Sequence, residues 1–171
     1  MTWVSPSLHI SEITAKAHQR ASSILRCFVS NDVNLLARAF TVYVRALVGY
    51  CSIAWSPCLK HDIEQLEKVQ RRFTKMLHGL RSLPYKDRLR FLGLPSSELR
   101  RLQLDLICCY NIVFRLVDVN FSDFFEFSRV TNTRGHAYKL YKSHCNHSIR
   151  SQFFAERIVL IWCGIAYTHL R

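Results

Sequence analysis

Residues 59–79, LKHDIEQLEKVQRRFTKMLHG, give the clearest structural signal in the chain. Their apolar residues recur every three or four positions, which is the period of a helix that buries one face. The spacing predicts a helix over residues 59–78, and Gly79 suits the C-terminal cap. The side chains expected to face the core are Ile63, Leu66, Val69, Phe73, Met76 and Leu77.

The same period continues on both sides of this segment. Ser30-Asn31-Asp32 is a ready N-cap for a long apolar helix, which should be the most buried one. That helix has to end by Pro57, because proline disfavours helix in the residue before it. Helices are predicted over about 11–28, 33–55, 85–92 (closed by Gly93), 97–117 and 149–162. We therefore expect a mainly α fold, a helical bundle of about five or six helices.

The composition changes at Ser128. Residues 128–150 contain five Lys or Arg, three His and no acid, and Arg134-Gly135 is a turn signal. We expect a short basic loop or β-hairpin there, before the last helix. The predicted domains are thus a helical domain, 1–127, and a basic segment with a C-terminal helix, 128–171.

The chain is strongly basic. It has 24 Lys and Arg against 12 Asp and Glu, so its net charge is +12 and its pI is about 9.7. Such a balance favours phosphate-bearing partners, nucleic acid or an anionic membrane, over a small-molecule substrate. The longest charge-free stretch of the core, residues 46–59, is too short for a membrane span of roughly 20 residues. We expect no signal peptide and no membrane partner.

The seven cysteines point to an intracellular compartment. Their number is odd, two are adjacent and several lie in apolar runs, so we interpret them as reduced, buried thiols. The protein is expected to be intracellular, either nuclear or cytoplasmic.

No catalytic motif is present in the sequence. Glycine-rich phosphate loops, a G-x-S-x-G nucleophile, H-E-x-x-H and paired aspartates are all missing, and the twelve acids are scattered. We therefore expect no enzyme activity and no cofactor. His136, His144, Cys145 and His147 are metal-competent, but their spacing matches no zinc module. Polar loop residues near phosphates are the favoured interpretation, and a metal-dependent nuclease is the alternative.

A basic stripe lies opposite the apolar face of the 59–78 helix. Lys68, Arg71, Arg72 and Lys75 stand at i, i+3, i+4 and i+7, as expected of a helix that packs one side and contacts phosphates with the other. The alternative is a solvated face in which Glu64 pairs with Lys68 and Glu67 with Arg71, which would partly neutralise it. Arg72, Lys75 and Arg81 have no such partner in the sequence.

The acid-free segment is a second candidate element. Its basic residues alternate with aromatic ones, so the former can follow a backbone while the latter stack on bases. Alternatively, it is a surface loop whose tyrosines, Tyr138 and Tyr141, pack on the domain. The predicted nucleic-acid contacts are Lys68, Arg71, Arg72, Lys75, Arg81, Arg134, His136, Tyr138, Lys139 and Lys142.

Several consecutive motifs resemble one known family. They are Trp55-Ser56-Pro57, LEKVQRR at 66–72, Arg88-Leu89 with Leu92-Gly93-Leu94, Arg100-Arg101, Asp105-Leu106, TRGH at 133–136, Phe153-Phe154, Arg157 and Trp162. In this order they resemble the region downstream of the polymerase palm in reverse transcriptases of LINE-type, non-LTR retrotransposons of the jockey-like kind. The resemblance covers roughly residues 8–162. It departs after Trp162, where the family continues with Asn and Leu-Pro but this chain has Cys163-Gly164-Ile165.

The resemblance implies a thumb with a C-terminal extension. In the family, the thumb is a helical layer that grips the template–primer, and the catalytic aspartates lie in the palm, before the place where this chain begins. The expected function is weak, sequence-independent binding to the backbone of an RNA–DNA hybrid or duplex by a non-catalytic fragment. The alternative is an orphan helical domain, a decayed transposon remnant without activity, which self-associates through surface that would pack on a palm.

Overall fold

The structure, a computed structural model, describes residues 6–128, 138–144 and 150–165. These residues are mainly helical, which confirms the predicted fold class. The chain divides into two compact units, Met1–Arg101 and Leu102–Arg171. This division falls within a helix, whereas the predicted boundary after Phe127 follows composition and remains a prediction.

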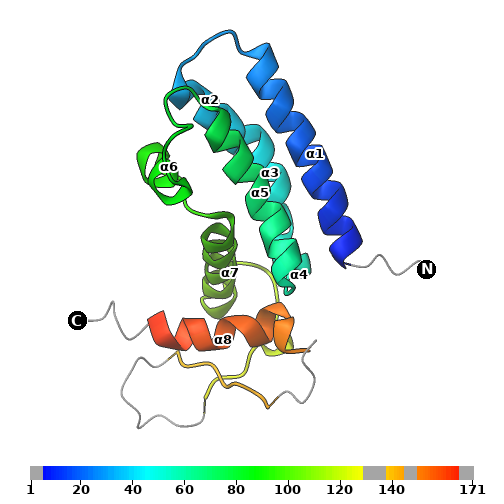
Figure 1. Cartoon of the computed structure of the whole chain (residues 1–171). Helices are drawn as coiled ribbons and strands as arrows, with labels where there is room; N and C mark the ends of the chain where they lie inside the picture. Colours follow the sequence, from blue (N-terminus) through cyan, green and yellow to red (C-terminus); the bar gives the residue numbers. More distant parts are fainter. Residues whose placement is uncertain (1–5, 129–137, 145–149, 166–171) are drawn as a thin grey trace. The chain divides into compact units, whose positions relative to one another are not determined.

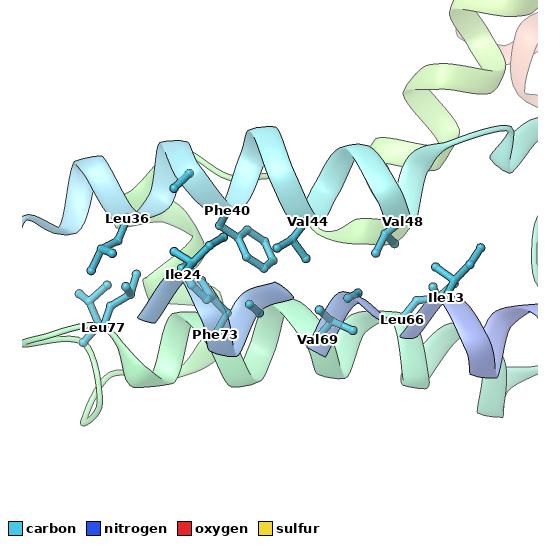
Figure 2. Close-up of a cluster of buried hydrophobic side chains, with 14 of the residues drawn as sticks. Ile13, Ile24, Leu36, Phe40, Val44, Val48, Leu66, Val69, Phe73 and Leu77 are labelled. Atoms are coloured by element: carbon cyan, nitrogen blue, oxygen red, sulfur yellow. The ribbon is translucent and has the colours of Figure 1, made fainter. Parts of the chain in front are cut away.

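The first unit is built on two long helices that pack side by side. Helix α1 (Pro6–Cys27) lies along α5 (Lys60–Met76), and α2 (Val33–Phe40) and α3 (Ala46–Gly49) also contact α1 (Figure 1). Figure 2 shows how their apolar side chains meet. The rings of Phe40 and Phe73 stack at the centre, with their centroids 4.3 Å apart. Ala17 and Ala21 are buried on α1, where small side chains let helices approach closely.

The predicted long helix over 33–55 is interrupted, which corrects the expectation. Asp32 caps α2 as expected, and its carboxylate accepts from the backbone N–H of Asn34 at 2.9 Å. The chain then forms a π-helical turn, η1 (Thr41–Arg45), in which the Thr41 hydroxyl donates to the Ala37 carbonyl. Cys51 adopts a left-handed conformation, φ 49°, and separates α3 from α4 (Ser52–Trp55). The predicted stop before Pro57 is confirmed, because α4 ends at Trp55.

This interrupted segment is buried on one side alone. Leu36, Phe40, Val44 and Val48 lie in the core (Figure 2). Leu35, Val42, Tyr43 and Tyr50 are exposed.

The predicted helices 59–78 and 85–92 closely match α5 and α6 (Tyr85–Leu92). Gly93 closes α6 in a left-handed conformation, φ 62°, as expected. Two details of α5 were predicted wrongly: Met76 is 64% exposed, and the helix is capped by Leu77 in an extended conformation, while Gly79 lies in the following turn. Ile63 is half-buried.

Helix α7 (Ser97–Val113) runs from the first unit into the second and ends four residues before the predicted position 117. Arg115 has a positive φ of 54°, and the N–H of Leu116 returns to the Asn111 carbonyl at 2.8 Å, which closes the helix. Although they continue the apolar period of this segment, Leu99 and Tyr110 are exposed, whereas Asp105, Cys109 and Ile112 are buried.

The second unit joins α7 to α8 (Phe154–Ile165) around a cluster of aromatic rings. The Phe125 ring contacts the rings of Phe121 and Phe154. Phe121 begins the 3₁₀ turn Phe121–Asp123, and a second 3₁₀ turn, Arg150–Gln152, comes just before α8. An antiparallel bridge joins Phe127 to Leu140, so two extended segments pair where a hairpin was one expectation. The last helix begins at Phe154 rather than at the predicted residue 149.

Candidate nucleic-acid interface

The basic stripe of α5 is exposed as predicted. Lys68, Arg71, Arg72 and Lys75 are all solvent-exposed, while Leu66, Val69 and Phe73 of the same helix are buried. Seven residues at a rise of 1.5 Å place Lys75 about 10 Å along the helix from Lys68. Arg81 is exposed in the turn after α5. A single helix face therefore presents four cations, and a fifth follows it.

The acids that were expected to neutralise this stripe do not do so. Neither Glu64–Lys68 nor Glu67–Arg71 forms an ion pair within the described part of the chain, where the ion pairs found lie elsewhere. Glu67 instead accepts hydrogen bonds from the Tyr85 hydroxyl and, at 2.9 Å, from the backbone N–H of Ser97. Of the two acids in the alternative interpretation, half-buried Glu67 therefore binds Tyr85 and Ser97 rather than Arg71.

Tyr85 is the centre of a polar network that fixes α6 against α5. Buried Gln70 donates to the Tyr85 hydroxyl at 3.3 Å and to the Pro95 carbonyl at 3.0 Å. Burial, together with the hydrogen bond to Glu67, raises the pKa of Tyr85 well above its usual range. The guanidinium carbons of Arg71 and Arg88 lie 5.1 and 5.4 Å from the Tyr85 ring centroid. Arg71 is therefore held at the Tyr85 ring while it remains exposed.

Arg45 completes this network from the π-helical turn. It is buried and donates to the Pro95 carbonyl at 3.1 Å. Burial, and then the nearby Arg100 charge, lower the pKa of Arg45 to about 10. The sequence analysis missed this network, because its members are spread over four segments and no spacing links them.

A groove of about 340 Å³ lies between α1 and α5, next to the stripe. Buried apolar residues Ala21, Val69 and Phe73 line it, and so do the exposed cations Arg26 and Arg72. His18 also faces this groove, and burial, followed by the Arg72 charge, lowers its pKa. Sequence reasoning missed Arg26 and His18. The signal that identifies them is their place on α1 beside buried Ala17 and Ala21.

The second basic element is described in part. Arg134 and His136 lie outside the described residues. Tyr138, Lys139 and Lys142 belong to the second unit. The Tyr138 ring contacts Phe114 and Phe127, with centroids 5.0 and 6.5 Å apart, which matches the packing alternative for this tyrosine. Lys142 and Tyr141 are exposed, and Lys139 is half-buried, with its carbonyl accepting from the Ser128 N–H at 2.8 Å.

Over the residues that the structure describes, no group of three or more His, Cys, Asp or Glu side chains is placed to hold a metal ion. His144 is exposed, and His136, Cys145 and His147 fall outside the described ranges. The expectation of buried thiols is wrong for Cys27, Cys51 and Cys58, which are exposed. Cys109 is buried, and burial raises the pKa of its thiol to about 12.

Among the described helices, none combines the length and apolarity that a membrane crossing requires.

Comparison with known proteins gives a partial match. No family model matches the chain, and no solved structure does. The chain is similar to an uncharacterized protein of Caenorhabditis elegans, with 26% identity over 108 residues. The match covers 61% of this chain and 54% of the worm protein, so the chain spans about half the length of this relative.

Proposed function

We propose that the chain is a non-catalytic, thumb-type segment of a non-LTR retrotransposon reverse transcriptase that binds nucleic-acid backbones weakly and without sequence preference. The ordered motifs between Trp55 and Trp162 support the origin. The helical, basic first unit supports the binding. Its partner is the phosphate backbone of an RNA–DNA hybrid or a duplex.

The observation that supports binding most directly is the diversion of Glu67 to Tyr85 and Ser97. It removes the acid that could pair with Arg71, which lies with Lys68, Arg72 and Lys75 on one exposed helix face about 10 Å long. A duplex presents one phosphate charge per about 1.7 Å of its axis when both strands are counted, so its two strands carry about six phosphates over that length. Contacts to phosphates fix position and do not read sequence.

Salt dependence tests this proposal. If the four stripe cations and Arg81 neutralise about five phosphates, the plot of log K against log salt should have a slope of about −4 to −5 on a duplex. Reversing Arg72 and Lys75 together to Glu should weaken binding to all sequences alike and make the slope shallower. The control is the double reversal of Lys16 and Arg38, which are exposed on α1 and α2 and change the net charge equally. A slope near zero, or equal effects of the two double variants, would contradict the proposal.

The alternative function is an orphan helical domain that self-associates. It is favoured by the exposed apolar and aromatic side chains Leu35, Val42 and Tyr43 on the outer side of α2 and η1. Exposed apolar patches on soluble domains mark interaction surfaces or aggregation sites.

A further inference from the structure

The groove between α1 and α5 combines an apolar lining with cations from both helices. Half-buried Leu25 and exposed Met76 supply accessible apolar surface beside the buried Ala21, Val69 and Phe73. The cations are Arg26 from α1 and Arg72 from α5. Its volume of about 340 Å³ lies at the small end of the range for ligand sites. Such a lining fits an uncharged group that has a flat apolar face and is covalently attached to anions.

Arg72 belongs to the groove and to the basic stripe at once. A strand whose phosphates contact Lys68, Arg72 and Lys75 therefore passes the mouth of the groove. The groups that such a strand offers to the groove are its bases, because each base is a flat, uncharged ring system joined to the backbone by one sugar.

We propose that this groove holds one unpaired nucleobase of a strand whose phosphates lie on the α5 stripe. The inference rests on the proposed function and deepens it. The substrate class becomes a nucleic acid with an unpaired nucleotide, either a single strand or an overhang beside a duplex.

Two physical arguments favour an unpaired base over a paired one. Guanidinium planes, such as those of Arg26 and Arg72, stack on exposed base faces, as do histidine rings such as that of His18. A base inside a duplex is already stacked and paired, so its entry requires unstacking that costs a few kcal/mol. A blunt duplex then contacts the stripe alone, while an overhang contacts the stripe and the groove.

The test compares overhangs that differ only in their bases. One hairpin duplex carries a single-stranded overhang of three nucleotides. A second hairpin of the same sequence carries a three-unit sugar-phosphate overhang without bases, so the two substrates have the same number of phosphates. We expect the base-bearing overhang to bind about tenfold more tightly to the whole chain. A 2-aminopurine in the overhang should change its fluorescence on binding.

The second part of the experiment uses a variant whose side chain fills the groove. Ser22 lines the groove, and its neighbour Ser23 is exposed and donates to the Gln19 carbonyl of its own helix. Ser22→Trp should reduce affinity for the base-bearing overhang to that for the abasic one and leave the salt slope unchanged. Ser23→Trp should preserve the difference.

The outcomes separate the two proposals. Equal affinity of the wild-type chain for both overhangs, with a steep salt slope, overturns the groove and leaves the stripe. A flat salt slope for both overhangs overturns the proposed function. The comparison of overhangs uses the wild-type chain, so it decides the matter even if Ser22→Trp does not fold.

Discussion

At the scale of single residues, Tyr85 connects the candidate interface to the interior of the first unit. Its hydroxyl donates to Glu67 and accepts from Gln70, and its ring lies beside the guanidinium groups of Arg71 and Arg88. The same phenol therefore orders α6 and withdraws an acid from the basic stripe. Stability and surface charge are coupled through one side chain.

Removing the Tyr85 hydroxyl should destabilise the first unit. In Tyr85→Phe, Glu67 and Gln70 each lose a partner inside the protein, and we expect a loss of about 1–3 kcal/mol in the free energy of unfolding. Urea denaturation followed by circular dichroism measures it. Tyr50→Phe is the control, because Tyr50 is 74% exposed, and its effect should stay within about 0.5 kcal/mol. A Tyr85→Phe variant as stable as wild type would show that the network contributes nothing net.

At the scale of secondary-structure elements, one ion pair fastens α8 to the second-unit part of α7. Arg157 donates from Nε and Nη2 to the two carboxylate oxygens of Asp105, at 2.9 and 2.8 Å. Its Nη1 also donates to the Gln152 carbonyl at 3.0 Å, in the turn before α8. Both side chains are largely buried, and their two parallel hydrogen bonds form a bidentate pair.

Asp105→Asn should loosen this attachment. The asparagine keeps one carbonyl acceptor but removes the carboxylate charge opposite Arg157, and breaking such a buried pair costs about 3–5 kcal/mol. Hydrogen exchange should show faster exchange in α8 and in the C-terminal half of α7. Asp87→Asn is the matched control: Asp87 pairs with Arg90 at 3.5 Å on the surface, where a pair contributes about 0–1 kcal/mol. Unchanged exchange in α8 of Asp105→Asn would contradict this role.

The sequence predicted correctly those elements whose position is determined by neighbouring residues, and it missed features that depend on contacts between distant residues. Helices α5 and α6 have a regular apolar period and a local end signal, so their bounds follow from neighbouring residues. The interruptions at η1 and Cys51 have no such signal, because the helical apolar period continues through both of them. The burial of Asp105 on α7 cannot be predicted from nearby residues, because it depends on the pair with Arg157, 52 residues later.

The candidate site likewise has features that the sequence predicts and features that only the fold reveals. Exposure of Lys68, Arg72 and Lys75 follows from their position opposite Leu66 and Phe73 on one helix. The diversion of Glu67 depends on Tyr85 and Ser97, and the groove depends on α1, which is far from α5 in sequence. Contacts of this kind require the fold and cannot be derived from spacing.

At the scale of the whole molecule, a charge of +12 repels one copy from another, while the exposed side of α2 and η1 favours contact. Leu35, Val42 and Tyr43 are all exposed there. At 0.1 M salt, the repulsion between exposed charges more than about 10 Å apart is largely screened. Raising the salt concentration should therefore favour association. The orphan-domain alternative holds if the apolar contact outweighs the charge repulsion between copies.

Sedimentation velocity measures that balance. If the alternative holds, the average mass should rise with protein and salt concentration, and Val42→Lys should restore the monomer. Leu8→Lys serves as the control, since Leu8 is 55% exposed but lies on α1. A wild-type monomer at all salt concentrations would count against self-association.

The π-helical turn at Thr41–Arg45 has a consequence for how the gene can change. A π turn contains more residues than an α turn, so one residue too many is accommodated there. Loss of a single codon within this turn would convert it to regular helix and leave the residues on either side in nearly the same orientation. Val48 would then still face the core that contains Phe40. An in-frame deletion should therefore be less damaging here than in the regular helix α5, where it would rotate all following residues by about 100°.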